Sequence, residues 1–311
     1  MIVNLNKDKT HSGFFDYLQY IFVRLSIDLI RLLPLKVVYK LGEKIGYICW
    51  KLMTSRRLTV RNNLLIVRRW LEQHDEPKSK SFNSICLNSA TKAVFYRTTA
   101  NLLSSFSFTA LPVTRRSPLL EFENIDVLKD ATDQGKGVVL LMAHMGPWEL
   151  ISCFPEHFAQ HNVDAKFGAI YRPLKNDYIE KWYRLQRKSK GMELFKRKAN
   201  LLEVFKFINK GGILALLADQ RVTNGEISEF FGKPALTTPL VGLLSKKANT
   251  SVISLTLKYD RTCKLKAEFR LVDYKEANTR KGYAKITNKE LEQILCSDLT
   301  SGFWFHERFK T

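Results

Sequence analysis

A histidine and a glutamate five residues apart, His144 and Glu149, are well suited to proton transfer. An apolar run precedes His144, and a Gly-Pro break followed by an amphipathic run surrounds Glu149. This pattern predicts a buried strand at 138–143, a tight loop and a helix at 148–160 with Glu149 in its first turn. In such a unit the imidazole could act as a general base that Glu149 orients. The HxxxxE spacing alone is weak, because most histidines are structural.

Arginine and aspartate side chains follow other predicted strands. Arg172 comes directly after the predicted strand 165–171, and its planar guanidinium suits a phosphate or a developing oxyanion. Arg187 lies in the predicted helix 176–190 and could serve the same purpose. Asp219 ends another apolar strand, and polar groups at such ends are plausible site residues. The alternatives are a solvated basic helix for the arginines and an ordinary turn for Asp219.

The sequence lacks the pattern of a serine hydrolase, because it contains no GxSxG elbow. Direct attack by a substrate hydroxyl, with His144 removing its proton, therefore fits the residues better than a covalent acyl-serine. Neither a metal site nor a bound cofactor is predicted.

Alternating strand and helix patterns predict the elements that hold these side chains. The expected strands are 138–143, 165–171, 192–195 and 213–218, then a hairpin of 251–259 and 265–274; the expected helices are 148–160, 176–190, 201–209, one starting at 237–239, and 288–303. This order indicates an α/β fold with a mixed β-sheet flanked by helices. Ligands bind at the carboxyl ends of strands in such sheets, where His144 and Asp219 are expected.

The N-terminal third is apolar and helical in pattern. Its expected helices are 14–33, 35–53 and 85–111. Arg24, Asp28 and Arg31 interrupt the first helix and fall on one face at i, i+4 and i+7 spacing. Without a long uncharged run, this helix is either an interfacial helix or a weak membrane span, and an ordinary core helix is the alternative.

We divide the chain into membrane-associating helices at residues 1–55 and a single α/β domain at residues 56–311. A basic, partly apolar segment from Arg56 to Arg69 could hold anionic headgroups or form a solvated helix face. Residues 73–81 are polar and predict a loop. The aromatic tail 303–311 is predicted to pack the last helix onto the sheet.

The charge balance restricts the partners. The chain of 311 residues carries 50 Lys and Arg against 30 Asp and Glu, a net charge of +20. Such a surface favours an anionic membrane, an acidic protein or nucleic acid. A basic nucleic-acid-binding protein is the alternative from another class, although no reader motif occurs and the apolar N-terminus is awkward for it. Five scattered cysteines without a CxxC predict reduced, mostly buried thiols.

In this order and spacing, these stretches resemble the late acyltransferases of lipid A biosynthesis, the lauroyl/myristoyl (HtrB-type) family. The resemblance covers most of the chain and is carried by RRLTVRNNLL, AHMGPWE, YRPLKN with Arg187 downstream, LLADQR, FFGKPALTTPLVGLLSKKANTSVI and WFHERFKT. The family's histidine–carboxylate pair falls on His144 and Glu149. Its functional arginine and aspartate fall on Arg187 and Asp219.

The resemblance implies a glycerolipid-acyltransferase-like fold and transfer of a fatty acyl chain to a hydroxyl of a phosphorylated lipid A precursor. The implied donor is acyl carrier protein, less readily coenzyme A, and the implied location is the cytoplasmic face of the inner membrane. His144 would take the hydroxyl proton with Glu149 as its orienting partner. The residues assigned to substrate binding or to the oxyanion are Arg172, Arg187 and Asp219, beside backbone N–H groups near 146–148. The implied partners are the acyl carrier protein, the phosphorylated glycolipid and an anionic membrane, with no nucleic acid.

Two other lipid-modifying activities compete with this interpretation. A same-family enzyme could act on another glycolipid or on an aminolipid. A glycerol-phosphate or lysophospholipid acyltransferase would resemble HxxxxD followed by an FPEGTRS-like stretch, whereas here the acid after His144 is Glu149 and no such stretch follows.

Overall fold

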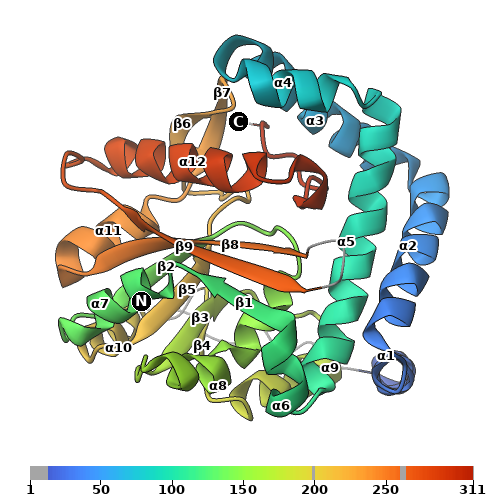
Figure 1. Ribbon diagram of the computed structural model, residues 1–311, viewed down its shortest axis with the longest axis horizontal. Coiled ribbons are helices and arrows are strands. Elements are labelled where there is room, and N and C mark those ends of the chain that lie inside the picture. The colour runs from blue at the N-terminus through green and yellow to red at the C-terminus, as the bar shows by residue number, and fades with distance from the viewer. Residues whose placement is uncertain (1–12, 198–199, 260–263, 311) are drawn as a thin grey trace, which may run out of the picture.

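The computed structural model describes residues 13–197, 200–259 and 264–310. A seven-stranded sheet in the order β1-β9-β8-β2-β5-β3-β4 runs through its centre (Figure 1). Its strands are β1 (Leu120–Glu123), β2 (Val138–Met142), β3 (Phe167–Tyr171), β4 (Met192–Lys196), β5 (Ile213–Leu217), β8 (Ser251–Tyr259) and β9 (Leu265–Val272). Strands β1 and β9 run antiparallel to the others. The predicted α/β fold with a mixed sheet is confirmed.

Helices cover both faces of this sheet (Figure 1). They are α1 (Phe14–Arg31), α2 (Leu35–Leu52), α3 (Thr54–His74), α4 (Glu76–Asn83), α5 (Leu87–Ala110), α6 (Val113–Arg116), α7 (Ile125–Asp133), α8 (Phe154–Phe158), α9 (Asp177–Lys188), α10 (Leu201–Asn209), α11 (Leu240–Ala248) and α12 (Arg280–Cys296). On β2, Val139 and Leu141 join a core closed by α3, α10, α11 and α12. Val138 and Leu140 join a second core closed by α7 and α8. Strand β2 is uniformly apolar because both its faces are buried.

Helices α2 and α5 stand across the end of the sheet at which the parallel strands β2, β5 and β8 finish (Figure 1). Tyr259, the last residue of β8, contacts Tyr39 of α2 and Ser104 of α5. Helix α2 approaches α5 closely, because a Cβ atom at Gly42 would lie only 2.4 Å from the Cα atom of Ala100. The carboxyl ends of these parallel strands therefore face helices α2 and α5.

Helix α1 lies against α9 through polar and aromatic contacts. Asn176, which caps α9, donates to the carbonyl of Asp16 at 2.8 Å and to the side-chain oxygen of Gln19 at 2.9 Å. Arg31 donates to the side-chain oxygen of Gln186 at 3.1 Å. Its ion pair with Asp28 confirms that these charges share one helical face. The first helix is thus attached to the helix that carries Arg187.

The other side of α1 is apolar and exposed. Phe15 is 85% exposed, Phe22 72% and Leu29 65%. Across the part of the chain that the structure describes, no helix combines the length and the apolar character needed to cross a membrane.

Several predicted elements differ from the structure. The predicted loop at 73–81 is wrong, because α4 begins within it: the Asp75 side chain accepts from the Lys78 N–H, and Pro77 occupies the first turn. The predicted helix at 148–160 is divided into the 3-10 helix η2 (Trp148–Cys153), α8 and the 3-10 helix η3 (Ala159–His161).

Other differences concern boundaries and missed elements. The closing helix spans residues 280–296 and not 288–303. Strand β1 and helix α7 were not predicted, nor was the hairpin of β6 (Glu226–Phe230) and β7 (Lys233–Thr237).

The cysteines are partly as predicted. The four within the described residues are free thiols, but only Cys153 is buried. The expectation of mostly buried thiols is therefore wrong for this part of the chain. Cys263 lies outside the described residues.

Candidate active site

His144 and Asp219 occupy equivalent positions at the ends of two neighbouring strands. Met142 at the end of β2 pairs with Leu217 at the end of β5, so each polar side chain lies two residues beyond its strand. The Nδ1 atom of His144 is 2.7 Å from Oδ1 of Asp219. Because the carboxylate accepts from Nδ1–H, a neutral imidazole presents the lone pair of Nε2 as a proton acceptor.

The loop after β2 is fixed by a tight turn and by the tail. Gly146 has φ of 58°, and a Cβ atom there would lie 2.1 Å from the carbonyl oxygen of Leu257. A side chain at this position would meet both backbone strain and a clash. The N–H of Phe303 donates to the carbonyl of His144 at 2.8 Å. The backbone that carries the imidazole is therefore held from two sides.

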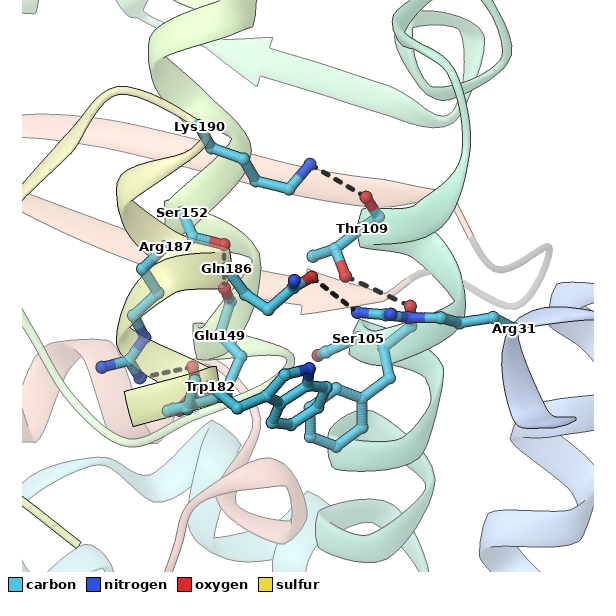
Figure 2. Close-up of a pocket in the computed structure, with 11 residues that line it drawn as sticks. Arg31, Ser105, Thr109, Glu149, Ser152, Trp182, Gln186, Arg187 and Lys190 are labelled. Atoms are coloured by element: carbon cyan, nitrogen blue, oxygen red, sulfur yellow. Dashed lines mark hydrogen bonds and ion pairs between the residues drawn. The ribbon is translucent and has the colours of Figure 1, made fainter. Parts of the chain in front are cut away.

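Glu149 has a different partner. Arg187 of α9 donates to Oε2 of Glu149 at 2.7 Å (Figure 2). Tyr183, one turn earlier on α9, lies beside this pair, because the guanidinium of Arg187 is 4.2 Å from the centre of its ring. Glu149 was predicted to orient His144, but the hydrogen-bond partner of His144 in the structure is Asp219.

The two carboxylates are kept ionised by different groups. Burial alone raises the pKa of Glu149, but the charge of Arg187 and the hydrogen bond from Tyr183 bring it below its ordinary value. Burial also raises the pKa of Asp219, and the charge and hydrogen bond of His144 outweigh that effect and lower it. Glu149 is thus paired with Arg187, which stays charged, and Asp219 with His144, which can gain or lose a proton.

The same contacts make His144 more basic than a free imidazole. Burial lowers its pKa, but the charge and hydrogen bond of Asp219, with a further contribution from the charge of Glu149, raise it above 6.5. Both carboxylates thus stabilise the imidazolium that a general base forms.

A small polar cavity adjoins the Glu149–Arg187 pair (Figure 2). Its volume is about 30 Å³, which is room for one or two water molecules. Arg31 from α1 and Thr109 from α5 line it opposite Gln186 of α9. The first helix therefore contributes directly to the surroundings of the candidate catalytic residues.

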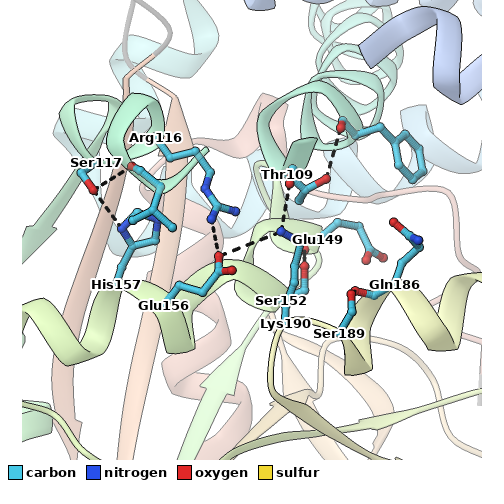
Figure 3. A network of polar contacts seen from close by, with 12 residues as sticks. Thr109, Arg116, Ser117, Glu149, Ser152, Glu156, His157, Gln186, Ser189 and Lys190 are labelled. Carbon is cyan, nitrogen blue, oxygen red and sulfur yellow. Dashed lines mark hydrogen bonds and ion pairs between the residues drawn. The ribbon is translucent and has the colours of Figure 1, made fainter. Parts of the chain in front are cut away.

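A second polar network anchors the far end of α9 (Figure 3). Lys190 donates to the carbonyl of Thr109 at 2.9 Å and lies 4.0 Å from Glu156. Glu156 in turn pairs with the buried guanidinium of Arg116. Together with Asn176 at its start, these contacts fix both ends of the helix that presents Arg187.

The tail does more than pack the last helix. Trp304 is buried in the core, which agrees with the predicted packing role. The ring of Phe303, however, lies beside the imidazole, and His306 and Arg308 share a small polar cavity with Asp219. These contacts were not predicted, although a histidine and an arginine within an aromatic tail were a usable signal.

Arg172 stands apart from the centre of the site. Its side chain is exposed, and its charge acts on His306, whose pKa is lowered mainly by burial. His144, Glu149, Arg187 and Asp219 share one polar centre, whereas Arg172 lies at its rim.

A comparison with protein families matches a range of the chain that contains this site. A family model described as bacterial lipid A biosynthesis acyltransferase matches residues 7–311. No curated protein matches the sequence. The matched range includes every residue of the site described above.

Proposed function

Because the chain belongs to the bacterial lipid A biosynthesis acyltransferase family, we propose that it transfers a fatty acyl chain from acyl carrier protein to a hydroxyl of a phosphorylated lipid A precursor. Coenzyme A is the alternative donor. The observation that carries the proposal is the hydrogen bond of 2.7 Å between His144 and Asp219, which leaves Nε2 as the proton acceptor. A thioester already carries an activated acyl group, so this chemistry needs no further cofactor.

His144 acts as the general base in this mechanism. Its Nε2 takes the proton of the acceptor hydroxyl while the oxygen forms a bond to the thioester carbonyl carbon. The tetrahedral intermediate collapses by breaking its carbon–sulfur bond, and the imidazolium returns the proton to the departing thiolate. Asp219 fixes the tautomer and steadies the imidazolium, and Glu149 adds its negative charge from the other side.

The oxyanion of the intermediate needs hydrogen-bond donors. Arg187 already donates to Glu149, so its contribution is chiefly the charge that balances this carboxylate. The backbone N–H groups at the start of η2, next to Pro147, have no acceptor within that helix and fit the oxyanion better. In this mechanism His144 and Asp219 carry out proton transfer, and the backbone N–H groups at the start of η2 stabilise the oxyanion.

The surface charge supports the choice of partners. A net charge of +20 suits an acidic carrier protein, an anionic membrane and a phosphorylated acceptor. Arg172 at the rim is placed to meet a phosphate group of the acceptor. Nucleic acid is not among the proposed partners.

The exposed side of α1 supports docking on a membrane surface. Its apolar residues would enter the headgroup region of the inner membrane at the cytoplasmic face, with α1 lying in the plane of the interface. This arrangement brings the carboxyl ends of the strands close to a lipid acceptor.

Acyl transfer by the purified protein tests the proposal. The full chain in lipid vesicles is given acyl carrier protein loaded with a fatty acid and a phosphorylated glucosamine disaccharide bearing 3-hydroxyacyl chains. Mass spectrometry should show one added acyl chain, which His144→Ala reduces by at least about 10²–10⁴-fold. His161→Ala, at an exposed histidine, is the matched control. A folded His144→Ala protein within a few-fold of wild type would contradict the mechanism.

A further inference from the structure

Arg308 in the tail is a buried cation without a carboxylate partner. Its side chain is 3% exposed, and no ion pair includes it among the residues that the structure describes. Its hydrogen bonds go to neutral acceptors: the carbonyl of Leu236 at 2.7 Å, the hydroxyl of Thr237 at 2.7 Å and the side-chain oxygen of Asn288 at 3.1 Å. A buried charge of this kind is costly unless an opposite charge compensates it.

The compensating charge is that of Asp219. Burial lowers the pKa of Arg308 to about 10, and the negative charge of Asp219 is the influence that opposes this shift. Both side chains line one cavity of about 10 Å³, together with Asn63, Gln220 and His306. The Nε atom of Arg308 is buried and has no hydrogen-bond partner. A single water molecule fits this volume and could join the two groups.

The charge of Asp219 is thereby shared between two groups. On one side its carboxylate accepts from His144, and on the other it faces the cavity with Arg308. The other charged or titratable groups that act on this region are Glu149, which is paired with a cation, and His306. Farther out are the exposed arginines at positions 56 and 172, which act on His306. Arg308 is the buried cation of this group.

We propose that Arg308 is a positioning residue that balances the charge of Asp219 and so keeps His144 available as a neutral base. A carboxylate without such a counterion would hold the proton on the imidazole more tightly. The base would then be blocked at a pH at which the enzyme should work. The effect on catalysis rests on the proposed function, whereas the effect of Arg308 on the pKa of His144 does not depend on it.

Titration of His144 in the full-length protein tests the inference without any substrate. NMR spectra of protein with labelled histidines give the midpoint, and the His144 signal is assigned by its loss in His144→Gln. Arg308→Gln should raise the midpoint by about half a pH unit or more, because a nearby positive charge is removed. Arg308→Lys keeps the charge and should leave the midpoint at its wild-type value. The acid limb of kcat/KM should move in the same way.

Arg116 supplies a matched control. It is also a buried arginine with unpartnered guanidinium nitrogens, but it pairs with Glu156 away from His144. Arg116→Gln should lower thermal stability and leave the His144 midpoint unmoved. Equal shifts in Arg116→Gln and Arg308→Gln, or no shift in a folded Arg308→Gln protein, would overturn the inference.

Two further comparisons keep the test decisive. Arg308→Met retains side-chain bulk without a buried amide and replaces Arg308→Gln if that variant does not fold. Asp219→Asn should lower the His144 midpoint, because it removes the carboxylate charge that raises the pKa of the imidazole. A protein that shows the shift but no acyl transfer would refute the proposed function and leave this inference intact.

Discussion

Two carboxylates flank His144, and their partners set them apart. Asp219 follows β5 and hydrogen-bonds to the imidazole, whereas Glu149 lies on η2 and pairs with Arg187. Both carboxylates have a lowered pKa and both raise that of His144. The two carboxylates nevertheless stabilise the protonated form of His144 to different extents, because the positive charge of Arg187 largely neutralises the negative charge of Glu149. Asp219 should therefore matter more for proton transfer than Glu149.

The largest difference is expected from replacing Asp219. In Asp219→Asn the amide can donate to Nδ1 and favour the wrong tautomer, with the proton on Nε2. We expect kcat to fall by roughly 10³–10⁴-fold, as for the loss of an orienting carboxylate in other base-catalysed acyl transfers. Steady-state rates of acyl transfer, measured with the folded variant, test this expectation.

The pH profile identifies the cause of that loss. A neutral imidazole is the active form, so the wild-type kcat/KM should fall as the pH drops through the raised pKa of His144, above 6.5. Removing the Asp219 charge lowers this pKa, and the acid limb of the residual activity should move to lower pH. An unmoved limb in Asp219→Asn would show that the carboxylate does not act on the base.

A smaller effect is expected on the Glu149 side. Glu149→Gln leaves the half-buried guanidinium of Arg187 without its counterion, and Arg187→Gln leaves the carboxylate unpaired. We expect each single variant to lose about 10²-fold in kcat/KM, the lower end of the range for lost acid–base assistance. The kinetic constants of both variants and of the double variant measure this.

The double variant separates a paired charge from two independent roles. If the pair acts as a unit, Glu149→Gln combined with Arg187→Gln should be no worse than the more damaging single variant. Losses that multiply would mean that Arg187 stabilises the transition state separately. That result would restore the predicted oxyanion role of Arg187.

The central strands β2 and β5 were predictable from sequence because both their faces are buried. Runs such as 138–142 and 213–217 are almost purely apolar and bounded by glycine or polar residues. The hairpin of β6 and β7 was harder, because its exposed positions alternate with buried ones over only a few residues. Helix α4 was missed because its composition is polar, although Asp75 and Pro77 are ordinary helix-start signals.

The partner of His144 was less predictable than the residues around it. Glu149 is close in the sequence, and nothing in the sequence states which strands are neighbours. The order β2-β5 and its register, with Met142 opposite Leu217, bring Asp219 to the imidazole from far along the chain. The sequence thus offered His144, Glu149 and Asp219 as candidates, and the sheet topology decided which of the two carboxylates contacts the imidazole.

The smallest expected effect tests whether α1 supports the Glu149 side from a distance. Arg31 lines the cavity next to Glu149 and donates to Gln186 of α9. Arg31→Gln should lower kcat/KM by about 3–10-fold, the scale of one lost hydrogen bond of about 1 kcal/mol. Acyl transfer to acceptor in vesicles is the measurement, with vesicle binding recorded in parallel.

Arg24→Gln is the matched control for this last variant. Arg24 lies on the same helix, but its hydrogen bond goes to Tyr20 of α1 itself. Both variants remove one positive charge from α1, so they should change binding to anionic vesicles equally, while Arg31→Gln alone lowers kcat/KM. Equal losses of activity would mean that α1 contributes only to membrane binding. The Glu149–Arg187 pair would then be held in place by α9 and by the contacts of Asn176 and Lys190 at its two ends.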